Sequence, residues 1–184
     1  STSTSLGSFT LISESRPKTP KTSIRETITS NFKKQWFSDL NNITKNPILR
    51  VYISIKQEFK QEFYLNAVND PKYRIAITKL RASSHTLEIE RGRQTRPKKA
   101  IEERLCPICK VIEDEIHFLI KCVMYETERN IFFCNVACIF PSFAGLNEQE
   151  KFQYLLNNNN PQILTWLGKF IFYSFKHRSL VCNT

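Results

Sequence analysis

The sequence predicts a mostly α-helical fold, and three observations lead to this prediction. Apolar residues recur at helical spacing along most of the chain. Polar capping signals stand directly before several of these stretches. Only 4 of the 184 residues are glycine, so the chain is short of the residues that tight hairpin turns need. With 41% hydrophobic and 24% charged residues, the composition is that of a globular protein.

Residues 1–21 are predicted to be a disordered linker, because they are rich in Ser, Thr, Lys and Pro. Ser23 and Glu26 then have the form of a capping box, which predicts the start of a helix. The apolar stripe of this helix consists of Ile24, Ile28, Phe32, Trp36 and Leu40. We expect the helix to end in the stretch 41–47, and a second helix with an irregular first turn to cover residues 48–68.

Asp70 and Pro71 are predicted to cap and open a third helix, which runs to about residue 83. Its predicted core positions are Ile75 and Leu80, with Ile77 on the flank. Residues 91–99, farther along the chain, are too polar and too charged to pack. We therefore predict a basic loop there.

Residues 72–104 carry ten basic and four acidic side chains, a net charge of +6 in a chain whose total is +10. Such a density of cations favours a polyanionic partner, because each neutralised phosphate releases counterions and adds affinity. We expect this stretch to hold RNA or DNA, the alternative being a solvated charged face. Tyr73 and His85 are candidates for stacking on bases, or for packing within the domain. The candidate nucleic-acid-binding residues are Lys72, Arg74, Lys79, Arg81, Arg91, Arg93, Arg96, Lys98 and Lys99.

A cluster of cysteine and histidine follows, with the spacing C-x2-C-x7-H-x4-C. Its members are Cys106, Cys109, His117 and Cys122. Two cysteines at x2 spacing turn both thiolates toward one ion, and a further close pair completes a tetrahedron of the ligands that Zn²⁺ prefers. We predict a structural zinc site on a zinc-finger-like module, with four protein ligands and no open position. A short helix is expected over residues 112–121, with Cys122 where it ends.

Three further helices are predicted after this cluster. Pro141 stops the first, Asn147 and Glu150 form a capping box for the second, and Asn160 caps the third. Their apolar residues are Met124, Phe132, Val136 and Phe140 in the first, Phe152, Leu155 and Leu156 in the second, and Ile163, Leu164, Leu167, Phe170, Ile171 and Phe175 in the third.

The three remaining cysteines are not predicted to bind metal. Cys134 and Cys138 lie four residues apart on a predicted helix, where packing in the core is expected more than a shared metal ion. Cys182 stands near the end of the chain and is expected to be inert.

The predicted organisation is a linker (1–21), a basic helical region (22–104), the zinc-finger-like module (105–124) and a C-terminal helical region (125–184) that packs with the rest as one domain. The chain has no Gly-rich phosphate loop, G-x-S-x-G or H-E-x-x-H motif, so we do not expect an enzyme or a small-molecule substrate. It also lacks an apolar run of about 20 residues and a signal pattern, so we expect an intracellular protein, nuclear or cytoplasmic, that is neither secreted nor inserted in a membrane.

Three motifs in this order resemble the C-terminal region of non-LTR (LINE-type) retrotransposon reverse-transcriptase polyproteins. The motifs are L-R-x-x-x-H from Leu80 to His85, C-P-x-C from Cys106 to Cys109, and E-x-x-x-H-x-x-x-x-C from Glu113 to Cys122. The resemblance covers roughly residues 49–178. It implies a domain that holds template RNA or target DNA while a polymerase elsewhere in the polyprotein copies it.

The resemblance also implies that the Cys3His cluster binds zinc and that the segment from Arg81 to His85 and the basic loop lie near nucleic acid. The polymerase's own aspartate motif is missing from this chain, so reverse-transcriptase activity is not expected of it. The x7 spacing differs from the x4 spacing of retroviral nucleocapsid knuckles, so that fold is not expected. The alternative function is a zinc-dependent protein-interaction or scaffold module without nucleic-acid contact. The Phe-rich C-terminal helices would form its contact surface, in a chain with 14 phenylalanines.

Overall fold

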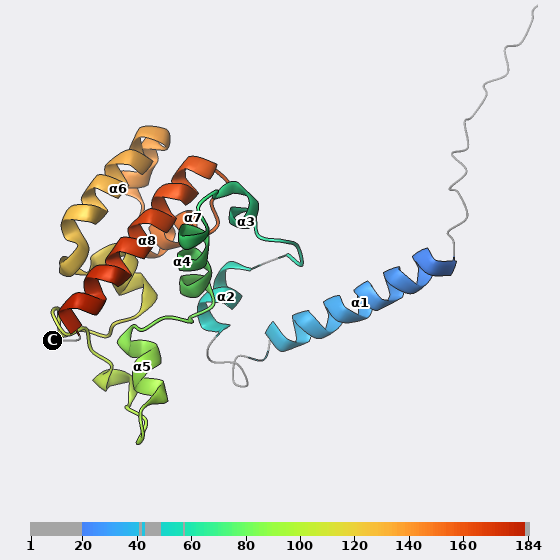
Figure 1. Cartoon of the computed structure of the whole chain (residues 1–184), viewed down its shortest axis with the longest axis horizontal. Helices are drawn as coiled ribbons and strands as arrows, with labels where there is room; N and C mark the ends of the chain where they lie inside the picture. The colour runs from blue at the N-terminus through green and yellow to red at the C-terminus, as the bar shows by residue number, and fades with distance from the viewer. Residues whose placement is uncertain (1–19, 41, 43–48, 57, 183–184) are drawn as a thin grey trace, which may run out of the picture. The chain divides into compact units, whose positions relative to one another are not determined.

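The computed structural model describes residues 20–40, 42, 49–56 and 58–182 (Figure 1). Its described residues are mostly helical and contain no strand, as the sequence predicts. Two compact units divide the chain, one up to Ser38 and one from Asp39 onward. None of the described helices combines the length and the apolar composition that crossing a bilayer requires.

Helix α1 (Pro20–Leu40) begins three residues before the predicted capping box. It includes the last two residues of the predicted linker, and the rest of that linker lies outside the described residues. The predicted apolar stripe is largely uncovered, since Ile24, Ile28 and Phe32 are each at least 60% exposed. The helix ends at Leu40, directly before the stretch predicted to stop it.

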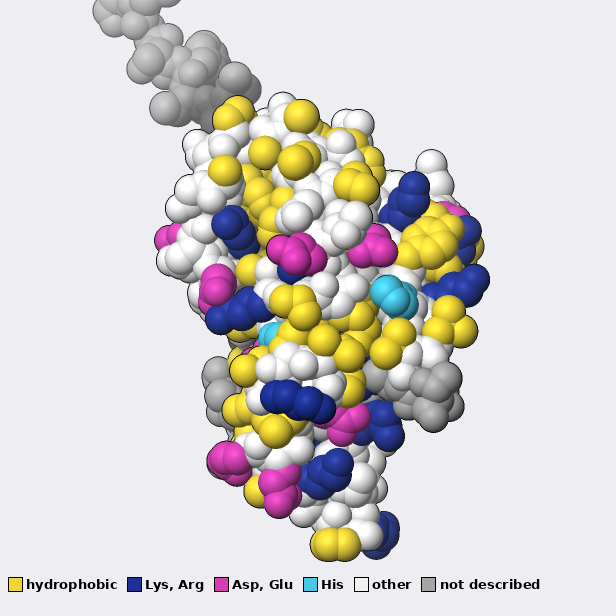
Figure 2. All heavy atoms as spheres, turned by 90° about the vertical axis from the view of Figure 1, so that its left-hand side faces the viewer, with side chains coloured by type: hydrophobic (Ala, Val, Ile, Leu, Met, Phe, Trp, Pro, Cys, Tyr) yellow, Lys and Arg dark blue, Asp and Glu magenta, His cyan; other side chains and the backbone are white. Residues whose placement is uncertain are grey.

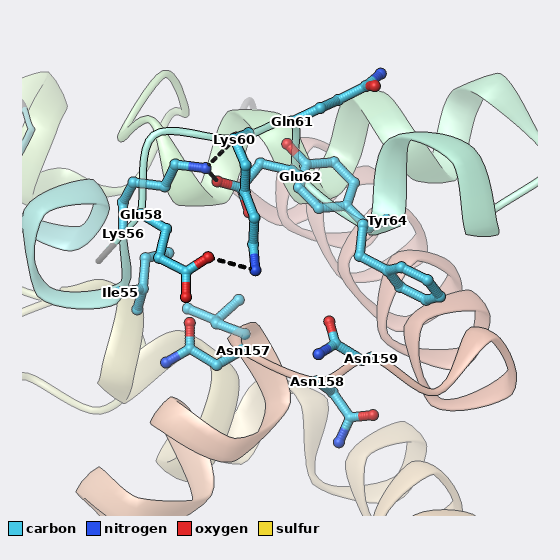
Figure 3. A pocket seen from close by; sticks show the side chains of 12 residues that line it. Ile55, Lys56, Glu58, Lys60, Gln61, Glu62, Tyr64, Asn157, Asn158 and Asn159 are labelled. Carbon is cyan, nitrogen blue, oxygen red and sulfur yellow. Dashed lines mark hydrogen bonds and ion pairs between the residues drawn. The ribbon is translucent and has the colours of Figure 1, made fainter. Parts of the chain in front are cut away.

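The single helix predicted over residues 48–68 is wrong, because the chain bends between α2 (Arg50–Ile55) and α3 (Tyr64–Ala67). Lys56 takes an extended backbone conformation, and its ammonium group is buried against the carboxylate of Glu62 at 2.5 Å (Figure 3). Residues six apart lie on different faces of an α-helix, so this ion pair requires the bend.

Helix α4 (Pro71–Arg81) starts as predicted, with the Asp70 carboxylate accepting a hydrogen bond from the backbone N–H of Lys72 at 3.0 Å. The prediction of its buried face is half wrong. Leu80 and Ile77 are buried, whereas Ile75 is 54% exposed. The reason is that α4 packs against α8 (Pro161–Cys182) through the face that includes Ile77.

The sequence predicts a loop over residues 91–99. Residues 91–94 belong instead to a helix, α5 (Glu88–Gln94). Gly92 sits in this helix against the side chain of Arg104, where an added Cβ would lie 2.6 Å from the Arg104 Cγ. Arg104 also donates hydrogen bonds to the carbonyls of Ile89 and Lys99, so it fixes the end of α5 and the chain that follows. These contacts of Arg104 are tertiary, so the local sequence around α5 does not predict them.

The remaining elements form the C-terminal half. Short helical turns at Ile101–Glu103, His117–Lys121 and Val123–Tyr125 precede α6 (Glu126–Ile139), a 3-10 turn at Pro141–Gly145, and α7 (Glu148–Leu156). The predicted capping box of α7 is present, and Asn160 caps α8 through hydrogen bonds from Gln162 and Ile163.

Helix α8 is the centre of the second unit. It contacts α3, α4, α6 and α7, and Figure 1 shows it between α4 and α6. Leu167, Ile163 and Ile171 on this helix are fully buried. Gly168 allows a close approach of α4, because an added Cβ there would lie 2.7 Å from the Tyr73 Cβ. The packed helices hold the cysteine-bearing segment 105–122 in place.

Candidate metal centre

Cys106 and Cys109 lie in a tight turn that brings their two thiols close together. The backbone N–H of Cys106 donates to the carbonyl of Val111 at 2.7 Å, and that of Lys110 donates to the carbonyl of Cys106 at 3.0 Å. Lys110 has a φ of 58°, in the left-handed region, which lets the chain reverse at this point. The N–H of Cys109 donates to the Cys106 sulfur at 3.4 Å. The x2 spacing therefore forms the turn that the motif predicts.

His117 and Cys122 are brought together by a π-helical turn. Asp114 accepts a hydrogen bond from the His117 N–H at 2.7 Å, and the Cys122 N–H donates to the His117 carbonyl at 2.7 Å. A π turn closes hydrogen bonds between residues five apart, whereas an α turn closes them between residues four apart. The π turn at His117–Lys121 therefore explains how ligands with x4 spacing meet at the end of one helical segment.

The four ligand atoms converge in the geometry of a four-coordinate ion. The three sulfurs and the His117 ring nitrogen all lie within 4.8 Å of one another. The Cys122 sulfur lies 3.8 Å from that of Cys106 and 3.8 Å from that of Cys109. A tetrahedral site with zinc–sulfur bonds of about 2.3 Å has sulfur–sulfur edges of about 3.8 Å. The cluster is thus compatible with a metal site.

Because these side chains are largely buried, their thiol and imidazole groups have few favourable polar partners when no cation is bound. Burial raises the pKa of the Cys106 and Cys122 thiols, and it lowers the pKa of His117 although Asp114 and Glu113 act in the opposite direction. The Nε2 atom of His117 is buried and has no hydrogen-bond partner among the described residues. A bound cation would accept this lone pair and stabilise the thiolates, which is the chemistry that the donor set fits.

The backbone around the cluster is tied to the neighbouring helices. Arg129 on α6 is buried and donates to the carbonyl of Cys122 at 2.7 Å. Glu113 accepts hydrogen bonds from Arg178 on α8 at 2.7 and 2.9 Å. These contacts hold both ends of the segment that carries His117. The cluster offers four protein ligand atoms, which is the number that a closed four-coordinate metal site uses.

Glu115 anchors a second buried network beside the cluster. Its carboxylate pairs with Arg50 at 2.6 Å and lies 2.8 Å from Nε2 of His85, and the Ser83 hydroxyl donates to it at 3.0 Å. Burial alone would raise the pKa of Glu115, but the His85 hydrogen bond and the Arg50 charge outweigh it and lower that pKa to about 2. Sequence reasoning did not predict this network, because its members lie up to 65 positions apart.

This network places His85 in the interior, where its ring is 1% exposed and stacks against Phe175. In this interior position His85 packs within the domain rather than stacking on a base. Tyr73 packs edge-on against Phe172. Cys134 and Cys138, which were expected in the core, are both exposed on α6, because Phe132 and Val136 form its buried face. Cys182 has a side chain outside the described part of the structure.

The nine candidate nucleic-acid-binding residues do not form one equivalent set. Arg81 is buried, pairs with Glu62 at 2.6 Å and donates to the carbonyl of Leu156, so it does not face a ligand in solution. Arg74 is half-buried and donates to the carbonyls of Val68 and Asn69. Both belong to the fold rather than to an open basic surface.

Four other candidates have acidic neighbours and remain at least partly exposed. Arg93 pairs with Glu90 at 2.5 Å, Arg91 and Lys99 lie near Glu88, and the ammonium group of Lys72 lies 3.1 Å from Asp70. Three candidates are exposed and have no ion-pair partner among the described residues. These three are Lys79, Arg96 and Lys98.

Comparisons with known proteins add no assignment to this geometry. No protein-family model matches the chain, and no curated protein or solved structure matches it.

Proposed function

We propose that this chain forms a zinc-stabilised domain that binds nucleic acid, as an accessory domain of a retrotransposon reverse-transcriptase polyprotein. The observation that carries the proposal is the convergence of the ligand atoms of Cys106, Cys109, His117 and Cys122 within 4.8 Å of one another, in a chain with a strongly basic stretch directly before them in the sequence. The motif resemblance supports the polyprotein context, because the same four residues complete its cysteine–histidine pattern.

Zinc is the metal that this donor set favours. Three thiolates and one imidazole are soft to borderline ligands, and tetrahedral sites of this composition are typical of structural zinc. The free energy of binding would contribute to folding, on the order of 10 kcal/mol in small zinc domains. Zinc would hold the turn at Cys106 against the π turn at His117, and so fix the start of α6.

Nucleic acid is the partner that the charge distribution favours. The described chain between Lys72 and Arg104 holds unpaired cations on α4 and on the segment after α5. Lys79, Arg96 and Lys98 are exposed and can each approach a phosphate without breaking an ion pair that holds the fold. Such contacts supply affinity without sequence specificity.

The test is the salt dependence of binding to a labelled oligonucleotide, measured by fluorescence anisotropy. The double variant Arg96→Gln/Lys98→Gln is expected to bind more weakly at low salt, with a log–log salt slope smaller by about 1.4 on single strands or about 1.8 on duplexes. A matched variant, Lys34→Gln/Lys169→Gln, removes two exposed lysines elsewhere and should keep the wild-type slope. Equal slopes for all three proteins would contradict the assignment of the basic segment.

A second candidate function, protein docking, is favoured by exposed apolar residues around the cysteine turn. Leu105, Ile108, Val111 and Ile112 are each between 37% and 49% exposed, although they flank a buried cluster. Figure 2 shows hydrophobic side chains gathered among charged ones on one face of the molecule. Apolar docking would persist at moderate salt, whereas phosphate binding would collapse, so the same salt titration separates the two functions.

A further inference from the structure

A hollow of about 650 Å³ lies beside the α4–α8 contact, away from the Cys3His cluster. Its apolar lining includes Ile75, which is 54% exposed, and the partly buried rings of Phe172 and Phe175. The volume is within the range of small-ligand sites, which is about 300 to 1,000 Å³. The helical pattern placed Ile75 in the core, but its side chain is exposed and lines this hollow.

The charged side chains that line this hollow are all basic. They are Lys72 and Lys79 from α4 and Lys176 from α8, and no acidic residue lines it. Lys79 and Lys176 are exposed and have no ion-pair partner among the described residues. Lys72 and Lys79 stand about 10 Å apart along the axis of α4, at about 1.5 Å per residue. The apolar surface is therefore bordered by separated cations.

The cationic border continues toward the basic segment after α5. Gln94 lines this hollow and also a second one, whose other lining residues include Arg93, Arg96 and Lys98. The second hollow is likewise lined by no acidic residue. A ligand that spans both would meet cations along its length and an apolar surface at one end.

We propose that the α4–α8 hollow takes an unpaired base of single-stranded nucleic acid, while its lysines hold the neighbouring phosphates. This inference rests on the proposed function and names its ligand class. A base has apolar faces and hydrogen-bonding edges, and Ser84, Thr86 and Gln94 line the same hollow with polar groups. In a duplex the bases are stacked and paired, so a duplex reaches only the lysines.

The aromatic rings contribute differently to this site. Phe175 stacks on Phe118 at 4.6 Å and lies near-parallel to His85 at 6.0 Å, so its faces are already covered. Phe172 meets Tyr73 and Tyr173 in T-shaped contacts. The ammonium group of Lys72 lies 5.8 Å from the Phe172 ring centroid, beside this ring. We therefore assign the base contact to Ile75 and the ring of Phe172, and we expect no preference for one base.

The experiment compares a labelled single-stranded oligonucleotide with a duplex of the same sequence, using the full chain and fluorescence anisotropy. Ile75→Ser is expected to weaken single-strand binding about fivefold or more, because the apolar surface that a base would cover is lost, with duplex binding unchanged. Lys79→Gln/Lys176→Gln should reduce the single-strand salt slope by about 1.4. Because Ile75, Lys79 and Lys176 are exposed, thermal melting should show that these variants remain folded.

Ile131→Ser, at an exposed isoleucine on α6, is the matched control and should keep wild-type binding. Unchanged single-strand binding in both hollow variants, with loss in Arg96→Gln/Lys98→Gln, would overturn the hollow and leave the proposed function standing. Absence of binding to either nucleic acid at low salt would overturn both. An acidic amphipathic peptide that binds in an Ile75-dependent manner, where single strands do not, would overturn the proposal in favour of a protein partner.

Discussion

At the scale of single residues, Arg81 differs most from its expected role. It belongs to the basic stretch and to the L-R-x-x-x-H motif, yet its guanidinium group lies in the interior between Glu62 and the carbonyl of Leu156. Lys56 pairs with the same carboxylate, so one acidic residue serves two buried cations. Local sequence gives no sign of this, because Glu62 reaches Arg81 only after the bend between α2 and α3.

Arg81→Gln is therefore expected to lower stability rather than nucleic-acid affinity. The substitution removes the charged hydrogen bonds of Arg81 to Glu62 and to the carbonyl of Leu156, although Lys56 still pairs with Glu62, and the free energy of unfolding should fall by on the order of 2 kcal/mol. Lys79→Gln on the same helix is the matched exposed variant and should leave that free energy unchanged. Urea unfolding followed by circular dichroism measures both. Wild-type stability in Arg81→Gln would contradict the buried position of this side chain.

Glu115 gives a second prediction at this scale. Glu115→Gln leaves Arg50 and His85 without their shared carboxylate, and we expect the free energy of unfolding at pH 7 to fall by on the order of 3 kcal/mol. Glu58→Gln removes a carboxylate from an exposed ion pair with Lys60 and should have no measurable effect. Equal midpoints in chemical denaturation for the two variants would show that the Glu115 network does not support the fold.

At the scale of elements, the helices with local start signals could be predicted from the sequence. Asp70, Asn147 and Asn160 each accept the backbone hydrogen bonds that their positions predict, because a cap depends on residues only two or three positions away. Helix α5 and the bend after α2 could not be predicted in this way. They depend on Arg104 packing over Gly92 and on Lys56 meeting Glu62, which are tertiary contacts.

The candidate site, too, could be predicted only where its features depend on residues close in the sequence. The spacing of the four ligands identified the cluster, since three cysteines and a histidine at such short intervals are typical of a metal site. The π turn between His117 and Cys122 follows from the x4 spacing only in retrospect. The supports of the site come from distant helices, since Arg129 lies on α6 and Arg178, which pairs with Glu113, lies on α8, and neither arginine had a recognisable signal.

The close packing of α4 on α8 can be tested at Gly168. Alanine favours helices by about 1 kcal/mol over glycine, but the new Cβ would lie 2.7 Å from the Tyr73 Cβ and 3.0 Å from its backbone carbonyl oxygen. We expect Gly168→Ala to destabilise the domain by about 1 to 3 kcal/mol, as overpacking does. Gly145→Ala, where no atom lies within 4 Å of the added Cβ, should be nearly neutral. Thermal melts that rank the two variants in the reverse order would refute the close contact.

At the scale of the whole molecule, the net charge is +10, and the basic side chains of the described residues differ in what they contact. Arg50, Arg81, Arg129 and Arg178 are tied to carboxylates or carbonyls that hold the fold. The exposed cations on α4, on α8 and after α5 are the ones that the proposed nucleic-acid partner would contact. The total charge favours a polyanionic partner, but only part of the basic stretch is placed to contact one.

The stability of the whole second unit should depend on the proposed zinc ion. Chelation with EDTA is expected to lower both the helical circular-dichroism signal and the melting temperature, because the free energy of metal binding contributes to folding. Adding one equivalent of Zn²⁺ should restore both, whereas Mg²⁺ should not, since it prefers oxygen ligands. A melting temperature that is indifferent to chelation would argue against a structural metal.

The most direct test of the central claim is the mass of the natively folded chain, measured by native mass spectrometry under reducing, chelator-free conditions. We predict one zinc ion per wild-type chain, one per Cys134→Ser chain, and none in Cys106→Ser, because Cys106 is a buried member of the Cys3His cluster and Cys134 is exposed on α6. A wild-type chain that carries no zinc, or a Cys106→Ser chain that keeps it, would contradict the account.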